Sequence, residues 1–374
     1  MLILASFALA LPPVDSPLRL TGSGASDAAV VIGIEDYAFL PDVPYAERDA
    51  WAVSETLSAS IGVPRGRVNV LTDNPSREQM LSAVTEAAES VGTGGTVWVY
   101  FAGHGAADPA SGERVLLGVD AQAERDAFAS RGVTVEALEG AASEGGADVF
   151  LIIDACFTGK GRDGDALVPG ARMVIPTSWS TPSGVTEWSA TQPSQWASPL
   201  EDAEHGAFTY AVLGAMRGWA DGYTDGEPDG EVTTDEAHAY VQRTLRDLGV
   251  RNQQPSFTGL DRLLVSGRLE AAPDLRPVAR VPINRPPPVE YGPRVRDMRV
   301  IIGGGALAGV GLITAIGSFA AVSANPDASP QTVQTMKTVN AIGLVTFGAG
   351  AAVGGVAAIV PTRQGAVLKV GGTF

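Results

Sequence analysis

The strongest constraint on the fold is a pair of short, uninterrupted apolar runs at residues 96–102 and 149–153. Both runs are rich in β-branched and aromatic residues, and neither alternates with polar positions. Such runs are typical of strands buried on both faces, as in a parallel sheet covered by helices. The first run leads into His104, and the second leads into Cys156, the only cysteine of the chain.

The ends of these two strands carry the residues of a nucleophilic site. The carboxyl ends of parallel strands meet at one edge of a sheet, so we expect His104 and Cys156 to lie close together. A histidine that accepts a thiol proton is the partner a cysteine needs to attack a carbonyl group. The glycines on both sides of His104 leave room for a substrate backbone. The alternative is an inert buried thiol and an unrelated loop histidine.

The rest of the first 267 residues alternates between strand and helix patterns. This alternation predicts an α/β fold, a mainly parallel sheet flanked by helices on both faces. The formal charge of −16 argues against nucleic acid or an anionic membrane surface as the main partner. The predicted strands are 28–34, 68–71 and 262–265 besides the two apolar runs, with a hairpin near 114–119 and helices at 45–60, 76–91, 134–144, 208–219 and 235–248.

Clusters of glycine and proline divide the chain into domains. Residues 28–267 form the predicted folded domain, and the proline-rich stretch after it is typical of an extended spacer. The full division is 1–22 as a signal peptide or apolar tail, 28–159, 160–185 and 186–267 as two halves of the domain with a linker between them, 268–298 as a proline-rich linker, 299–361 as a transmembrane hairpin and 362–374 as a tail.

Two apolar stretches, 300–324 and 339–360, are each long enough to cross a bilayer and contain no charged residue. We therefore expect a membrane anchor. Basic residues flank both spans, and the positive-inside rule would place the folded domain in the cytoplasm. The apolar start at 1–12, with a small-x-small site at Ala8-Leu9-Ala10 but no preceding Lys or Arg, instead suggests a cleaved signal and an exported domain. Of the two, we favour the exported arrangement.

The two strand-end motifs resemble the histidine and cysteine motifs of caspase-type cysteine peptidases. The motifs span 100–105 and 154–159, and their His and Cys are 52 residues apart, near the spacing of about 50 known for caspases. The resemblance covers about 28–267, including 205–210, which is similar to the first small-subunit helix of bacterial members. Because of this resemblance we expect a caspase-like fold, with pairing of two chains through a sheet edge as a further implication.

The resemblance also implies a role for each matching residue. Cys156 would attack the scissile carbonyl, and His104 would move protons. The backbone N–H groups of Gly105 and Cys156 would hold the oxyanion, and no third catalytic group is expected.

Specificity follows from the residue two positions before the cysteine. Caspases have Gln there, whereas this chain has Asp154 and is similar to metacaspases, whose Asp binds a basic side chain. A carboxylate in a partly desolvated pocket selects Arg or Lys, so cleavage after these residues is predicted. Ser189 is assigned to the same pocket. No second pocket carboxylate stands near 188–191, and no arginine stands near Val43, where caspases have one.

Two further features have both a functional and a plain interpretation. Lys160, Arg162 and Arg172 lie in the predicted flexible linker, where family members are often self-cleaved. Residues 225–236 match a twelve-residue calcium loop, although an acidic surface turn with Thr233 or Thr234 capping the next helix explains them equally. The predicted Ca²⁺ ligands are Asp225, Glu227, Asp229, Glu231 and Glu236.

The leading hypothesis is thus a membrane-anchored cysteine endopeptidase. A related enzyme with a Ser-Ala-Cys-x-Thr-Gly motif is a rival, which Thr158-Gly159 favours and Asp154 does not. A catalytically silent caspase-like scaffold tethered to the membrane is the rival from another class of protein. His205 and His238 have no spacing that suggests a metal site, and we expect both at the surface or at helix caps.

Overall fold

The structure, a computed structural model, describes residues 11–20, 22–124, 127–162, 164–168, 181–275, 359–362 and 365–368. Its centre is a six-stranded sheet with the order β12-β8-β7-β3-β1-β2. The strands pair in parallel except for β12, which runs antiparallel to β8 at the edge. The strands are β1 (Ala28–Gly33), β2 (Val68–Leu71), β3 (Thr96–Ala102), β7 (Asp148–Asp154), β8 (Val185–Ser189) and β12 (Ser256–Thr258).

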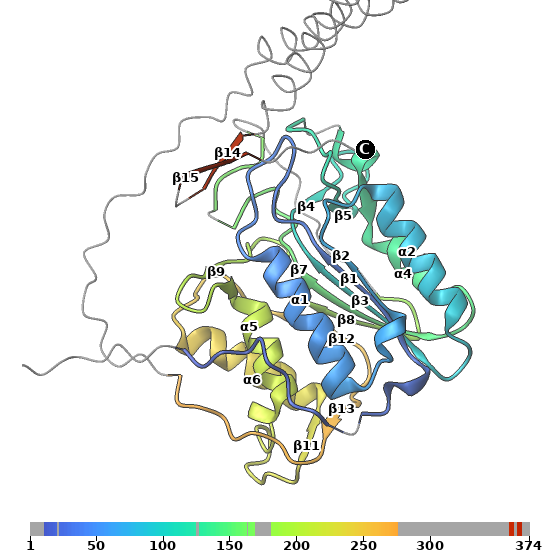
Figure 1. Cartoon of the computed structure of the whole chain (residues 1–374), viewed down its shortest axis with the longest axis vertical. Coiled ribbons are helices and arrows are strands. Elements are labelled where there is room, and N and C mark those ends of the chain that lie inside the picture. The colour runs from blue at the N-terminus through green and yellow to red at the C-terminus, as the bar shows by residue number, and fades with distance from the viewer. Residues whose placement is uncertain are drawn as a thin grey trace, which may run out of the picture. The chain divides into compact units, whose positions relative to one another are not determined.

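Helices cover both faces of this sheet, as predicted (Figure 1). On one face lie α1 (Ala46–Thr56), α5 (Ala207–Gly214) and α6 (Thr234–Asp247); on the other lie α2 (Arg77–Ser90) and α4 (Val135–Ser143). The middle strands β1, β3 and β7 are therefore buried along almost their whole length, which explains their continuous apolar runs.

Local sequence signals determine where several helices begin. Ser76 precedes α2 and accepts a hydrogen bond from Gln79 N, while the Gln79 side chain accepts one from Ser76 N. Thr233 and Glu236 make the same capping box before α6. These reciprocal bonds satisfy backbone donors that would otherwise have no partner at a helix start.

Smaller elements surround the main sheet. The predicted hairpin near 114–119 belongs to a three-stranded antiparallel sheet, and the predicted strand at 262–265 pairs with β11 rather than joining the main sheet. The edge strand β12 was not predicted, because it has only three residues. These elements are β4 (Gly105–Ala107), β5 (Arg114–Leu117), β6 (Gly132–Thr134), β9 (Pro199–Leu200), β10 (His205–Gly206), β11 (Glu231–Thr233), β13 (Leu263–Ser266), α3 (Phe128–Arg131) and the short helical turns 24–26, 57–61, 65–67 and 215–219.

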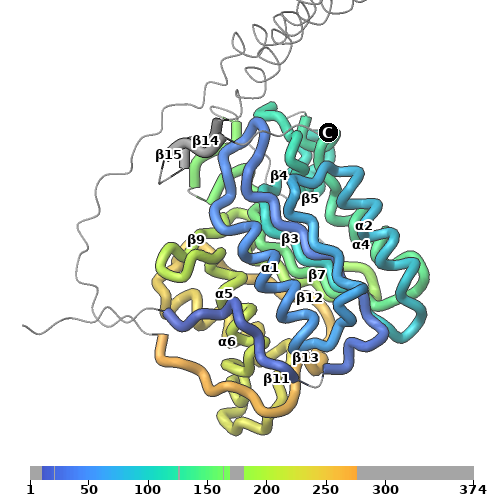
Figure 2. The backbone as a smooth tube through the Cα atoms, in the orientation of Figure 1, coloured from blue at the N-terminus to red at the C-terminus, as the bar shows by residue number. Residues whose placement is uncertain are grey.

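The amino-terminal residues 11–20 are part of the folded domain, so the predicted signal or tail over 1–22 is too long. Tyr210 Oη donates to Pro12 O (3.0 Å), and Leu20 N donates to Ala59 O (3.0 Å). Val14 is buried. Figure 2 shows this segment running past α5 and α1. Residues 1–10, which hold the predicted cleavage site, lie outside the described residues.

The chain separates into two compact units, 1–281 and 282–374. In the second unit, β14 (Ile359–Thr362) pairs antiparallel with β15 (Gly365–Leu368). Ile359 and Val360 thus lie in a strand, which contradicts a second span reaching residue 360. The remainder of the two predicted spans lies outside the described residues. In the part of the chain that is described, no helix is long and apolar enough to cross a membrane.

A buried cluster of three charged side chains joins β5, β8 and α4. Arg114 donates to both carboxylate oxygens of Glu187, at 2.5 and 2.8 Å, and its guanidinium carbon lies 5.3 Å from the ring centroid of Phe157. Glu139 is 2% exposed, and its Oε1 has no hydrogen-bond partner among the described residues. Burial, and then repulsion by Glu187, raises the pKa of Glu139 to about 7.

Glu139→Gln is expected to stabilise the protein at pH 8 and to have little effect at pH 4.5. The unfolded carboxyl ionises near pH ~4.3, so the folded state loses stability as the pH rises from there to about 7. The neutral amide removes this loss, and the melting temperature at pH 8 should rise by about 2–4 °C per kcal/mol regained. Thermal unfolding at both pH values measures it, with exposed Glu144→Gln as the control. An equal shift at both pH values would contradict the assignment.

Candidate active site

His104 and Cys156 follow two adjacent strands at equal distances. β3 and β7 pair in parallel, with Ala102 opposite Asp154, so each candidate residue lies two positions beyond this pair. Both side chains are buried, at 2% and 3% exposure. The sheet thus brings the histidine and the cysteine to one edge, because parallel strands in this register end together.

A backbone carbonyl orients the imidazole of His104. Nε2 lies 2.7 Å from Pro41 O, and because a carbonyl only accepts, this nitrogen carries the proton. Nδ1 is then the basic nitrogen. Tyr37 supports the same loop, since its hydroxyl accepts from His104 N (2.9 Å) and donates to Leu117 O (3.0 Å). The contact with Pro41 O could not be predicted, because a backbone carbonyl that accepts a hydrogen bond leaves no pattern in the sequence. No third catalytic group was expected from the sequence.

The thiol of Cys156 is held as a hydrogen-bond donor. Its Sγ lies 2.7 Å from Lys160 O, four residues further along the chain. Burial raises the pKa of this thiol above its ordinary value. The thiolate, not the thiol, is the nucleophile. The arrangement therefore keeps the cysteine in its less reactive form.

Gly105 passes close to the cysteine backbone. A Cβ at this position would lie 2.7 Å from Cys156 O, so a larger residue would push the two loops apart. The assignment of the Gly105 and Cys156 N–H groups to an oxyanion hole stays a prediction.

Two buried carboxylates form an acidic pocket beside the cysteine, which we define as Asp49 and Asp154. Asp154 Oδ2 accepts from Thr209 Oγ1 at 2.7 Å. Burial raises the pKa of Asp154, and the neighbouring Arg162 opposes this shift. Asp49, on α1, accepts from Gly206 N at 2.9 Å.

Asp49 is a buried carboxylate near Asp154 that sequence reasoning missed. A second carboxylate was sought after β8, whereas Asp49 comes from a helix whose acidic residues resemble a solvated face. Gly206 makes room for the pair, because a Cβ there would lie 2.3 Å from Asp154 Oδ2 and 2.9 Å from Asp49 Oδ2. The glycine at position 206 was the feature of the sequence that could have indicated this crowded site.

Ser189 lies near this pocket at the end of β8. Its neighbour across the strands is Ile153, the residue before Asp154. Ser189 is fully buried, and its Oγ has no hydrogen-bond partner among the described residues. Its assignment to the substrate pocket stays a prediction.

Arg162 fills the acidic pocket, which corrects its placement in a flexible linker. Nη2 lies 3.2 Å from Asp154 Oδ2 and 3.4 Å from Asp49 Oδ2. The Lys160 ammonium stacks on Trp196, with 4.4 Å from Nζ to the ring centroid. Arg172 lies outside the described residues.

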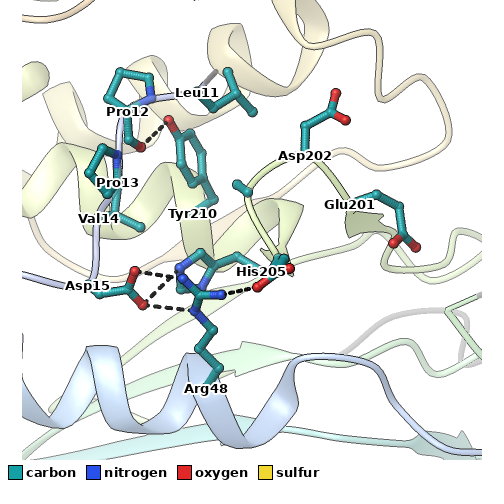
Figure 3. A pocket seen from close by; sticks show the side chains of 12 residues that line it. Leu11, Pro12, Pro13, Val14, Asp15, Arg48, Glu201, Asp202, His205 and Tyr210 are labelled. Carbon is teal, nitrogen blue, oxygen red and sulfur yellow. Dashed lines mark hydrogen bonds and ion pairs between the residues drawn. The ribbon is translucent and has the colours of Figure 1, made fainter. Parts of the chain in front are cut away.

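The amino-terminal segment reaches the pocket through His205. His205 Nδ1 lies 2.8 Å from Asp49 Oδ1, and its Nε2 lies 3.2 Å from Asp15 Oδ1. Arg48 holds Asp15 from the other side with two hydrogen bonds of 2.9 and 3.0 Å (Figure 3). A cavity of about 250 Å³ adjoins this cluster. His205 is therefore a buried link in a chain of charged groups and not a surface residue.

His238 is half-buried on α6. Trp188 Nε1 donates to its Nδ1 at 3.1 Å, and Gln242 Nε2 lies 3.0 Å from its Nε2. Burial lowers the pKa of His238, so it serves as a neutral packing and hydrogen-bonding residue.

The predicted calcium loop has no converging ligands. Glu236 accepts from Gly222 N and from Thr233 N, both at 3.0 Å, and so caps α6. Asp225 and Asp229 each accept from a backbone N–H two residues on. Within the described ranges, no group of three or more His, Cys, Asp or Glu side chains is placed to hold a metal ion. This geometry fits the acidic turn, and calcium binding stays a prediction.

A comparison with family models identifies one family. The model of the family described as "Peptidase_C14: Caspase domain" matches residues 26–263. Protein GSU0716 from Geobacter sulfurreducens is 15% identical, with a TM-score of 0.46, over 66% of this chain and 99% of that one. Caspase-1 from Spodoptera frugiperda is 17% identical, with a TM-score of 0.43, over 70% of this chain and 98% of that one. A search of curated proteins found no match.

Proposed function

Because this chain belongs to the caspase-domain family of peptidases, we propose that it is a cysteine endopeptidase that cleaves proteins after a basic residue. The observation that carries the proposal is the acidic pocket. Its two carboxylates, Asp49 and Asp154, are buried beside the end of β7, the strand that leads into Cys156. Two desolvated carboxylates bind a cation strongly and exclude an acidic side chain.

The proposed reaction uses the two strand-end residues. His104 Nδ1 takes the thiol proton, and Cys156 Sγ forms a bond to the scissile carbonyl carbon. The oxyanion is held by the N–H groups of Gly105 and Cys156. As the C–N bond breaks, the imidazolium returns its proton to the leaving amine. Water then hydrolyses the thioester, with His104 again as the base, and the free thiol is restored.

Three finer parts of the proposal concern the whole protein. The apolar stretch 300–324 and the part of the second stretch that precedes β14, 339–358, would anchor it in a membrane, and a sheet edge would pair two chains. Self-processing would occur within 160–185, at Lys160, Arg162 or Arg172. A Cys156→Ala protein that is still recovered as two fragments would contradict self-processing.

A silent caspase-like scaffold is the second candidate. The observation that favours it is the buried thiol of Cys156, whose Sγ donates to Lys160 O and whose pKa is raised by burial. The orientation of His104 by Pro41 argues for a working dyad, since a scaffold needs no fixed tautomer.

A panel of peptides ending in Arg, Lys, Asp and Ala tests the proposal on the full chain carrying Arg162→Ala, a change that removes the side chain filling the acidic pocket. We expect cleavage of the Arg and Lys peptides that disappears in Cys156→Ala. Faster cleavage after Asp than after Arg would refute the assignment of the acidic pocket to a basic side chain. If the protein is folded, its pocket is open and no peptide is cleaved, the result would favour the silent scaffold. The same assays with millimolar calcium, together with isothermal titration, test the acidic loop; no heat on titration would support the plain turn.

A further inference from the structure

The acidic pocket already holds a guanidinium, that of Arg162. This side chain is 4% exposed, and its Nη2 faces both Asp49 and Asp154. Its Nη1 donates to Pro44 O at 2.6 Å. The planar fork of an arginine suits several acceptors in fixed directions. The pocket is thus complementary to the kind of side chain that the proposed peptidase would select.

The loop that carries Arg162 is fastened at the cysteine. Besides the bond from Cys156 Sγ to Lys160 O, Gly161 N donates to Asp165 O (2.8 Å) and Leu167 N donates to Gly159 O (2.9 Å). Residues Lys160 and Ala166 also form an antiparallel bridge. The loop is therefore a compact hairpin and not an extended, substrate-like strand.

Arg162 is bound in a register that does not permit cleavage. A substrate that places its basic side chain in the pocket must present the carbonyl carbon of that same residue to the sulfur. Here the carbonyl beside the sulfur belongs to Lys160, two residues earlier, and its oxygen accepts the thiol proton. The loop thus places the Arg162 side chain in the pocket and holds the thiol in its protonated form through Lys160 O. The peptide bond after Arg162 does not face the sulfur and cannot be attacked in this arrangement.

We propose that Arg162 is a built-in competitor for the substrate's basic side chain, so that the protein rests in a latent state until this loop leaves the acidic pocket. The inference rests on the proposed function in assigning the pocket to substrate. An occupied pocket lowers the apparent affinity for substrate in proportion to the fraction of open molecules, so a pocket open ~1% of the time binds ~100-fold more weakly.

The same contacts favour arginine over lysine as the competing ligand. Two nitrogens of one guanidinium reach the carboxylates and Pro44 O from different sides. A lysine ammonium is a single point charge that cannot span these acceptors in the same way. We expect the open pocket to prefer arginine.

Arg162→Ala tests the latent state through the single thiol of the chain. Because Cys156 is the only cysteine, the rate of alkylation by iodoacetamide reports on this site alone. Once its loop is released, the thiol should react at least ~10-fold faster at pH 7.5 than in the wild type. Acetyl-arginine amide should slow this reaction in the variant but not in the wild type. Acetyl-citrulline amide, of similar shape but neutral, should slow neither.

Arg162→Lys and Arg243→Ala complete the set. Arg162→Lys keeps a buried cation and should fold while reacting at an intermediate rate; exposed Arg243→Ala should behave as wild type. Wild-type alkylation in folded Arg162→Ala, or no protection by the arginine amide, would overturn the proposal. If Arg162→Ala does not fold, wild-type alkylation of Arg162→Lys would show that Arg162 is a structural ion pair. Fast alkylation and arginine protection without peptide cleavage would leave this inference standing and refute the peptidase.

Discussion

Replacing Cys156 by alanine is expected to lower kcat/KM for an Arg-ending peptide by about 10⁴-fold or more. The change removes the atom that forms the covalent bond, while leaving the acidic pocket in place. His104→Ala should have a similarly large effect, because a thiol that keeps its proton is a poor nucleophile. The double variant should be little worse than either single one, since the two residues act as a unit. We would measure these rates in the Arg162→Ala background, where the pocket is expected to be open.

The control for His104→Ala is His238→Gln, which changes a half-buried histidine on α6 that accepts a hydrogen bond from Trp188 of β8. It should keep most of the activity even if it melts at a lower temperature. Activity in Cys156→Ala above one tenth of its parent would mean that another nucleophile, or a contaminating protease, performs the cleavage.

Asp49→Asn and Asp154→Asn, made in the Arg162→Ala background, are each expected to reduce kcat/KM for an Arg-ending peptide by about 10²-fold or more. Removing one partner of a buried charge pair costs about 2–5 kcal/mol, and ~1.4 kcal/mol corresponds to a factor of ten. The loss should be much smaller for an Ala-ending peptide, because this peptide has no charge to satisfy. The preference for Arg over Ala therefore measures the pocket directly.

The exposed Asp235→Asn is the matched control and should leave this preference unchanged. Because Asp49 and Asp154 contact the same cation, their effects should not add, and a double-mutant cycle measures the coupling. If both variants lowered activity on the Arg-ending and Ala-ending peptides equally, the carboxylates would support the fold and would not determine specificity.

Much of the architecture was predictable because it depends on local patterns. The continuous apolar runs that become β3 and β7 indicated strands covered on both faces, and both strands are buried on a parallel sheet. A strand's end determines where the next polar residue lies, so His104 and Cys156 were expected at one edge. The three-residue strand β12 carries too little pattern to be recognised, and only its pairing with β8 identifies it.

The acidic pocket was predictable only in part. Asp154 follows directly from the cysteine motif. Asp49 belongs to a helix that begins more than 100 residues before the cysteine, and its partners His205 and Gly206 are 156 and 157 residues away in sequence. On a helix in isolation, a carboxylate at this position is indistinguishable from one that faces water.

The amino-acid sequence by itself determined the order of strands and helices and the positions of the two candidate residues, His104 and Cys156, because periodicity and strand ends are properties of short segments. The tertiary structure decided which charges share the buried pocket, that Pro41 orients His104, and that Arg162 is the pocket's occupant. These contacts join segments that are far apart in the chain. A charged side chain is buried only where partners of opposite charge or hydrogen-bonding groups lie beside it. Such partners come together only when the whole domain is folded.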